Sequence, residues 1–228
     1  MQWTYSSDLQ ETRVSTGFMS KVYNWMFAAL LISWGTAYYV ATTPTILVAV
    51  MSLFTPIIII ELLFVFALSF FINKISAPVA MLLFIAYSIL NWLTLSVIFL
   101  AYSMSAIILA FGITAWTFFF MAMYWYFTKS DLSTFGTVMV MWLFGLILAT
   151  IVNIFLQSAL FDYILSWAWV IIFTWLTAYD NQKIKEMWEA GFANWETETK
   201  MSIMWALTLY LDFINLFLYI IKLFWSRD

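Results

Sequence analysis

Long apolar stretches alternate with short polar breaks along most of this chain. Seven stretches reach about 20 residues or more, the length that a helix needs to cross a bilayer. Prolines, serines and charged residues separate them, and Ser103–Ser105 divides the longest apolar run. The pattern predicts an all-α integral membrane protein with seven transmembrane helices in a single domain over 22–228, preceded by a polar, mostly loose tail over 1–21. The predicted helices are 22–43, 46–71, 77–102, 104–127, 134–156, 159–181 and 201–224.

Composition supports the membrane location and removes several kinds of chemistry. Hydrophobic residues make up 65% of the chain and charged residues 9%, whereas soluble domains average about 25% charged residues. Cysteine and histidine are both absent, which excludes disulfides, thiolate metal sites and imidazole pH sensors. Any proton sensor must therefore use carboxyl groups. The apolar composition indicates a lipid bilayer as the partner, and the small net charge of −3 and the lack of a basic run argue against nucleic acid.

The lysines and arginines predict an orientation, because cytoplasmic loops carry an excess of these residues. With seven spans, seven basic residues share the side of the N-terminus and two lie on the other side. We therefore expect the N-terminus in the cytoplasm and the C-terminus outside. The first group is Arg13, Lys21, Lys74, Lys129, Lys183, Lys185 and Lys200, and the second is Lys222 and Arg227.

Three carboxylic acids lie within or at the end of apolar helices, where ionisable side chains are costly and mark functional sites. Asp212 has apolar sequence on both sides, and Asp180 lies near the inner end of its predicted span. Glu61 lies 11 residues before Ile72, at the cytoplasmic end of its span, and Asp212 lies 11 residues after Met201. At about 1.5 Å per residue, both lie roughly 16 Å deep, on one level. The alternatives are a solvated Asp180 at a helix end, and neutral, hydrogen-bonded carboxyls at Asp212 and Glu61.

Amide side chains accompany these acids. Asn215 and Tyr219 lie three and seven residues beyond Asp212 and share its helix face. Asn91 and Asn153 lie in the third and fifth predicted spans. Such amides either support an ion pathway or only hold neighbouring helices together. Asp131, just before the fifth span, is interpreted as the N-cap of that helix.

Asp180 and Asp212 are predicted to form one site. Two carboxylates a few ångströms apart in a dry site repel each other, so one keeps its proton and the pair shares it. Ionising the second carboxyl would separate the helices or attract a cation between them. Ca²⁺ prefers oxygen ligands of this kind. The pair is therefore a candidate proton-sensitive gate with transient Ca²⁺ binding, and no resident cofactor is expected.

Several longer motifs resemble the Bax inhibitor-1 family of seven-span membrane proteins, in its bacterial branch. The similarity covers nearly the whole chain, from Lys21 to Arg227, and its last two motifs are long and specific. The motifs are KVYNWM (21–26), YSILNWLTLS (87–96), TKSDLS (128–133), VNIFL (152–156), LTAYDNQKIK (176–185) and ALTLYLDFINLFLY (206–219).

The resemblance implies a fold and a function. The last helix, 201–224, would be central and wrapped by the other six, and Asp180 and Asp212 would be a proton sensor that gates a calcium leak. Glu61 matches a membrane glutamate near the proposed pore of the family. Some members pair the sensor with an arginine late in the second span. Here FFINK places Ile72 at that position, with Lys74 nearby, so the arginine for such a salt bridge is missing.

Tryptophan stands at eight positions where relatives in the family typically carry glycine. The chain has 14 tryptophans and only 6 glycines, although membrane helix contacts favour small residues. Tryptophan at a packed glycine site costs about 1–3 kcal/mol. We hypothesise that the gene uses a code in which UGA means glycine and was translated as tryptophan; the alternative is a lineage that turned these sites toward lipid. The positions are Trp92, Trp116, Trp125, Trp142, Trp169, Trp175, Trp205 and Trp225.

Two other classes of function compete with the calcium leak. An intramembrane aspartyl protease needs two membrane aspartates, one in a Tyr-Asp pair such as Tyr179-Asp180. The second aspartate of such enzymes follows a Gly-x-Gly motif, whereas Asp212 follows Leu-Tyr-Leu, so we expect no enzyme. The main alternative is a regulatory protein that restrains a membrane protease or acts in a stress or cell-death pathway. The segments 1–20 and 186–200 would then contact the partner.

Overall fold

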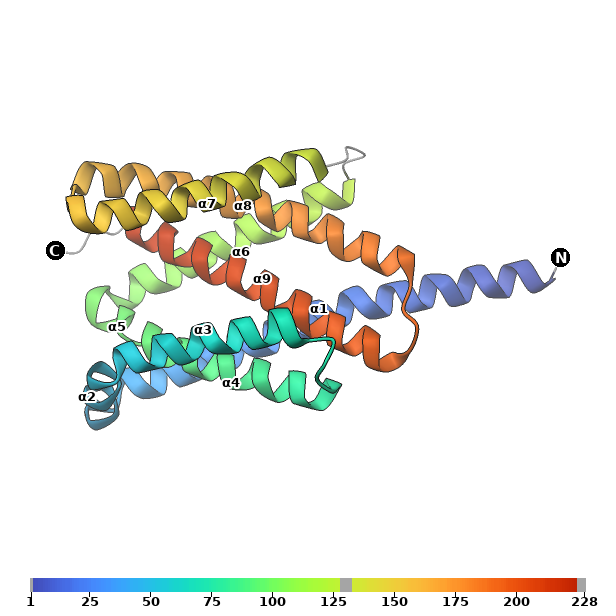
Figure 1. Cartoon of the computed structure of the whole chain (residues 1–228), viewed down its shortest axis with the longest axis horizontal. Coiled ribbons are helices and arrows are strands. Elements are labelled where there is room, and N and C mark those ends of the chain that lie inside the picture. Colours follow the sequence, from blue (N-terminus) through green and yellow to red (C-terminus); the bar gives the residue numbers. More distant parts are fainter. Residues whose placement is uncertain (1, 128–132, 225–228) are drawn as a thin grey trace. The chain divides into compact units, whose positions relative to one another are not determined.

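The apolar stretches form long α-helices. The computed structural model describes the backbone of residues 2–127 and 133–224, and the side chains of 17–124 and 135–224. This part of the chain is helical and contains no strand (Figure 1). The helices are α1 (Gln2–Ala41), α2 (Pro44–Ser52), α3 (Phe54–Phe71), α4 (Ala77–Leu95), α5 (Ile98–Ala101), α6 (Met104–Phe127), α7 (Ser133–Leu156), α8 (Ala159–Ala190) and α9 (Trp195–Phe224).

Six helical segments within the described residues are long and apolar enough to cross a membrane. They confirm the predicted all-α integral membrane fold. The boundary expected at Ser103–Ser105 is also confirmed, since α6 begins at Met104. α1 covers residues 22–41 of the first expected span, 22–43, but it is not among the six, so the count of seven transmembrane helices stays a prediction. The six are Phe54–Phe71, Ala77–Ala101, Met104–Tyr124, Phe135–Leu156, Ala159–Ala190 and Trp195–Phe224.

The second expected helix, 46–71, is wrong as a single element. The chain leaves the helical conformation at Leu53, with φ −104° and ψ 13°, and this residue separates α2 from α3. Pro56 explains the break, because a proline ring collides with the carbonyl four residues earlier and offers that carbonyl no N–H group. The carbonyl concerned is that of Ser52, the last residue of α2. Pro56 itself lies in the first turn of α3, where a missing N–H group is tolerated.

Three helices extend beyond the apolar stretches that predicted them. α1 begins at Gln2, so the segment 1–21 is helical from that residue and not mostly loose. α8 continues to Ala190 and α9 begins at Trp195, which reduces the expected loop over 186–200 to residues 191–194. A count of apolar residues cannot detect these extensions, because their sequences are polar.

Capping groups set both ends of the short linker between α8 and α9. Gly191 has φ +76°, the left-handed conformation that commonly ends a helix. The Oδ1 atom of Asn194 accepts a hydrogen bond from the backbone N–H of Thr197 at 2.8 Å, as an N-cap residue does. Glu196 and Glu198 lie in the first turn of α9, where the helix dipole favours acidic residues.

Some expectations fall outside the described residues. They include Asp131 as the N-cap of the fifth span, and three basic side chains used to predict the orientation: Arg13, Lys129 and Arg227.

The helices group into two compact units. The first comprises residues 1–100 and 184–210. Within it α1 packs against α4, and α4 packs against α3. The buried side chains of α3 are Ile57, Glu61 and Leu68, which lie along one face of the helix.

Two contacts in this unit attach the start of α9 and the linker before it to α1. The Nζ atom of Lys21 donates a hydrogen bond to Oε1 of Glu198 at 2.8 Å. The ring of Phe18 lies 4.6 Å from that of Phe192, measured between centroids.

The second unit comprises residues 101–183 and 211–228. The ring of Phe213 on α9 contacts Phe111 and Phe118 on α6, with centroid distances of 5.1 and 5.8 Å. The indole N–H of Trp169 on α8 donates to the hydroxyl of Thr150 on α7 at 3.1 Å.

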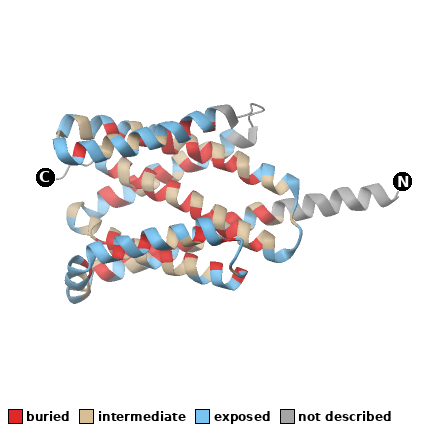
Figure 2. Ribbon diagram, in the orientation of Figure 1, coloured by how far each residue is buried: buried red, intermediate tan, exposed pale blue. Residues whose placement is uncertain are grey.

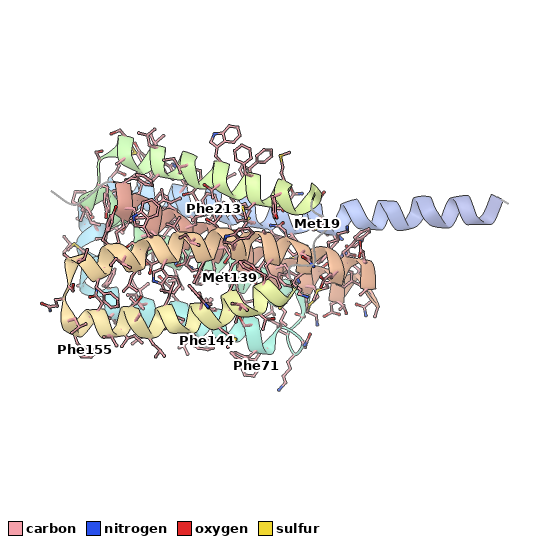
Figure 3. The ribbon with its side chains drawn as sticks, turned by 90° about the horizontal axis from the view of Figure 1, so that it is seen from above. Met19, Phe71, Met139, Phe144, Phe155 and Phe213 are labelled. Carbon is pink, nitrogen blue, oxygen red and sulfur yellow. The ribbon has the colours of Figure 1, made fainter. Side chains whose placement is uncertain are left out.

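Burial differs strongly between the helices. In its most apolar window, 61% of the residues of α9 are buried, against 6% in α3 and 11% in α7, a contrast visible in Figure 2. On α7, Phe144 and Phe155 point outward (Figure 3) and are 63% and 83% exposed. The outer faces of α3 and α7 are therefore apolar surfaces suited to lipid, whereas α9 is the most buried of the six spans.

The eight tryptophans at positions where relatives typically carry glycine lie in different environments. Trp116 and Trp142 are 62% and 63% exposed, so the cost of overpacking does not apply to them. Trp92 is buried and contacts the ring of Trp34, and Trp169 is buried and stacked. Trp175 and Trp205 are partly buried. The side chains of Trp125 and Trp225 lie outside the described part of the chain. The miscoding hypothesis stays a prediction.

Candidate functional site

Asp180 lies inside α8 and not at its end. The helix continues for ten residues to Ala190, and the side chain of Asp180 is only 9% exposed. The alternative of a solvated aspartate at a helix end is therefore wrong. The apolar run ends near residue 181, but the helix does not, because the polar sequence that follows remains helical until Gly191.

The structure brings Asp180 and Asp212 together. Three pairs join α8 to α9 in antiparallel order within the second unit. Near the start of α8, Lys222 donates to Asp162 at 2.6 Å, and further along Trp169 stacks on Tyr219 with centroids 5.3 Å apart. The third pair is Asp180 and Asp212, whose carboxyl groups are hydrogen-bonded to each other.

The hydrogen bond between the two aspartates requires a proton, since two carboxylates offer only acceptors. Asp212 is 5% exposed, and its Oδ2 atom is buried without a hydrogen-bond partner. An unpartnered oxygen costs less on a neutral carboxyl than on a carboxylate, because a buried charge needs compensation. Asp212 is therefore the better donor to a carboxylate on Asp180.

Close helix packing fixes the position of α8 beside the pair. Gly136 on α7 lies against the side chain of Tyr179, the residue before Asp180, and leaves no room for a β-carbon. The amino group of Lys183 lies over the same ring, 5.5 Å from its centroid. Tyr179 is thereby held between α7 and a residue one turn along its own helix.

The two amides of this unit do not join the pair. Asn153 is 9% exposed, and its Oδ1 atom accepts a hydrogen bond from the backbone N–H of Ser158 at 3.3 Å. This bond closes the turn after α7, where Gln157 has φ +50°, so Asn153 has a structural contact there. Asn215 is partly buried, and its side chain has no hydrogen-bond partner among the described residues. Their roles in an ion pathway stay predictions.

Glu61 lies in the first unit, within a separate group of polar side chains. It is 9% exposed. The hydroxyl of Thr94 donates to its Oε1 atom at 2.9 Å, and the amide of Asn91 donates to its Oε2 atom at 3.5 Å. Because Glu61 and Asp212 belong to different units, the common depth expected for them stays a prediction.

No sequence pattern identified the other members of this group. Tyr210 on α9 donates to Oδ1 of Asn91 at 3.2 Å, and its hydroxyl lies 2.9 Å from that of Ser33 on α1. Hydroxyls in apolar helices often bond only within their own helix, as Thr114 and Thr117 do with the carbonyl four residues earlier. Nothing in the spacing of Ser33, Thr94 or Tyr210 distinguishes them from such residues.

Neither group is a complete metal site. In the part of the chain that the structure describes, no three carboxylic acids gather where they could hold one ion. Ca²⁺ takes about 6–8 oxygen ligands. Asp180 and Asp212 offer four carboxyl oxygens, fewer than this number, and transient binding of Ca²⁺ by the pair stays a prediction.

These observations define an all-α integral membrane protein with two buried carboxyl sites, one of them a hydrogen-bonded aspartate pair. The sequence model of the family described as "Inhibitor of apoptosis-promoting Bax1" matches residues 15–228. The chain belongs to this family, the Bax inhibitor-1 family, as its motifs indicated. The family is not a known enzyme family.

Several bacterial proteins are similar over nearly their whole length. An uncharacterized protein of Borreliella burgdorferi is 40% identical over 225 residues, covering 97% of both chains. The inner membrane protein YbhL of Escherichia coli K12 is 41% identical over 214 residues, 92% of both chains. An uncharacterized protein of Deinococcus radiodurans is 39% identical over 211 residues, covering 92% of this chain and 91% of its own.

Proposed function

We propose that this chain is a proton-regulated calcium leak of a bacterial cytoplasmic membrane, gated by Asp180 and Asp212. The observation that carries the proposal is the hydrogen bond between two buried carboxyl groups on α8 and α9. The calcium activity itself is taken from the family resemblance. The inner-membrane location is supported by the name of the Escherichia coli relative.

The gate follows from what the pair does with one proton. While the proton is present, the carboxyl groups attract each other and hold α8 against α9. When it leaves, two unit charges about 4 Å apart repel by about 4 kcal/mol at an effective dielectric of about 20. This energy exceeds the value of a typical hydrogen bond, about 0.5–1.5 kcal/mol. The ionised pair therefore separates or takes up a cation, and either change favours passage of Ca²⁺.

The sign of the pH effect follows. The closed arrangement contains the shared proton, so flux is low in acidic buffer and rises as the pH increases. Ca²⁺ competes with the proton for the same oxygens and acts in the same direction as a rise in pH.

The test measures Ca²⁺ entry into proteoliposomes that contain the full-length chain, at a series of pH values. Asp180→Asn, Asp212→Asn and the double variant keep the shape of the pair and can keep its hydrogen bond, but cannot place two charges in it. We expect low flux at every pH in all three. The matched control is Asp162→Asn on the same helix, whose carboxyl is 42% exposed and paired with Lys222.

The control should retain the pH dependence of the unmodified protein. Absence of flux from the unmodified protein would remove the calcium leak as the function. A rise of flux with pH in the double variant equal to that of the unmodified protein would show that the bundle conducts but that the aspartates do not gate it.

A further inference from the structure

Glu61 is the other buried acid of the described chain, and the aspartate gate does not use it. It is more than nine-tenths buried on α3 and faces α4. No lysine or arginine in the described residues pairs with it. The titratable groups that face it are the phenols of Tyr87 on α4 and Tyr210 on α9. Its charge must therefore be balanced by a proton or by a cation.

The hydrogen-bond donors around Glu61 indicate whether a proton or a cation balances its charge. Both carboxyl oxygens face hydrogen-bond donors, the hydroxyl of Thr94 at 2.9 Å and the amide N–H of Asn91 at 3.5 Å. A cation could approach only through the lone pairs that these two donors leave free, since a carboxylate has about four acceptor sites, whereas a proton on the carboxyl can use the Thr94 oxygen as its acceptor. Among the described residues, Glu61 belongs to no group of three acids that could hold a metal ion. The arrangement favours a proton.

Thr94 allows the proton to bind without the loss of a hydrogen bond. Its hydroxyl lies 2.9 Å from Oε1 of Glu61 and 2.7 Å from the backbone carbonyl of Asn91, but it has only one hydrogen. With Glu61 ionised, the hydroxyl donates to the carboxylate. With Glu61 protonated, the new O–H of the carboxyl donates to the Thr94 oxygen, and Thr94 donates to the Asn91 carbonyl. The heavy atoms need not move.

The amide of Asn91 is held in the orientation that this exchange requires. The hydroxyl of Tyr210 donates to Oδ1 of Asn91 at 3.2 Å, which turns the Nδ2 group toward Glu61. Ser33 holds the Tyr210 hydroxyl from the other side, at 2.9 Å. Four helices, α1, α3, α4 and α9, therefore contribute to one connected network inside the first unit.

We propose that Glu61 is a second proton-binding site, independent of the aspartate pair, in which the Thr94 hydroxyl reverses its hydrogen bond as the proton arrives or leaves. The ligand is a proton from water, and the products of the step are a neutral carboxyl and one rotated hydroxyl. The inference does not depend on calcium conduction.

Infrared difference spectroscopy on the full-length protein in lipid nanodiscs tests the proposal, because a protonated carboxyl has a C=O band that a carboxylate lacks. We expect a band that decreases as the pH rises, is absent from Glu61→Gln, and persists when Asp180 and Asp212 are both asparagine. In Thr94→Val the band should move to higher frequency, since the carboxyl loses its hydrogen-bond acceptor. Thr94→Ser keeps the hydroxyl and should leave the band in place.

Three results would overturn the proposal. The first is no difference between the unmodified protein and Glu61→Gln at any pH, which means that Glu61 never holds a proton. The second is a band of unchanged frequency in Thr94→Val, which removes the role of the hydroxyl. The third is loss of the Glu61 band when Ca²⁺ is added at constant pH to the Asp180→Asn, Asp212→Asn double variant. That result would make Glu61 a cation site.

Discussion

Replacing Gly136 by alanine places a methyl group against the ring of Tyr179. The β-carbon would overlap the Cγ, Cδ2 and Cε2 atoms of that ring. The ring cannot simply swing its tip away, because the overlap includes the atom nearest the backbone. Either Tyr179 changes its rotamer and leaves the position beneath Lys183, or α7 and α8 move apart. Both responses disturb α8 one residue before Asp180.

A matched glycine on the same helix isolates the steric cost. Gly145 has no atom within 4 Å of the position where a β-carbon would stand. Each Gly→Ala change in a helix interior gains about 1 kcal/mol from helix propensity, and this gain is common to both variants. Overpacking costs about 1–3 kcal/mol. We therefore expect Gly136→Ala to be about 1–3 kcal/mol less stable than Gly145→Ala.

The assay is reversible chemical unfolding in detergent micelles, which gives the free energy of unfolding for each variant. A second pair of measurements adds Tyr179→Ala to both backgrounds. Without the ring, Gly136→Ala should become as favourable as Gly145→Ala, because contacts that share a partner are not additive. Equal stability of the two alanine variants in the presence of Tyr179 would refute the close contact between α7 and α8.

Two further predictions use other contacts. Thr150→Val leaves the buried indole N–H of Trp169 without its acceptor and should lower the free energy of unfolding by about 1–3 kcal/mol; Thr150→Ser, which retains the hydroxyl, should not, and equal loss in both variants would contradict the hydrogen bond. The miscoding hypothesis predicts that protein from the native source has an intact mass lower than the printed sequence by eight differences between tryptophan and glycine, and a mass that matches the printed sequence would end it.

The parts of the fold that could be predicted are those where an apolar run ends at a strong break. α6 spans Met104–Phe127 as expected, because Ser103 and Ser105 interrupt the apolar sequence on one side and a polar segment follows on the other. α7 is equally close to its expected span. The length of the apolar run predicts one helix over 46–71 and gives no sign of the break at Leu53. Pro56 is the residue that signals the break, because its ring prevents the helix from continuing.

The C-terminal end of α8 and the N-terminal end of α9 differ from the expected spans for another reason, whereas the start of α8 and the end of α9 agree with them. Apolar counting stops where the chain becomes polar, whereas a helix stops where its terminal backbone groups find other partners. Gly191 and Asn194 supply those partners, and both are ordinary capping residues that a search for caps would have found. The same extension of α8 buries Asp180 within a helix, so the position of the cap changes the interpretation of the site.

The members of the candidate site could be predicted from the sequence, but their pairing could not. Carboxyl groups in apolar helices are expensive, which identified Asp180, Asp212 and Glu61 without any tertiary information. Which of them meet depends on the register between helices. The ion pair of Asp162 with Lys222 and the stack of Trp169 on Tyr219 record that register for α8 and α9, but no pattern within either segment specified it.

The two carboxyl sites differ in how they supply hydrogen-bond partners to buried carboxyl oxygens. At Glu61 the protein supplies donors to both oxygens, and the Thr94 hydroxyl can also accept a hydrogen bond while it donates to the Asn91 carbonyl, so the ionised and the protonated carboxyl both keep hydrogen-bond partners. At the aspartate pair one carboxyl is the other's partner, and Oδ2 of Asp212 has none. Loss of a single proton there leaves two facing charges without further compensation. For this reason we propose that Ca²⁺ competes with the proton at the aspartate pair and not at Glu61.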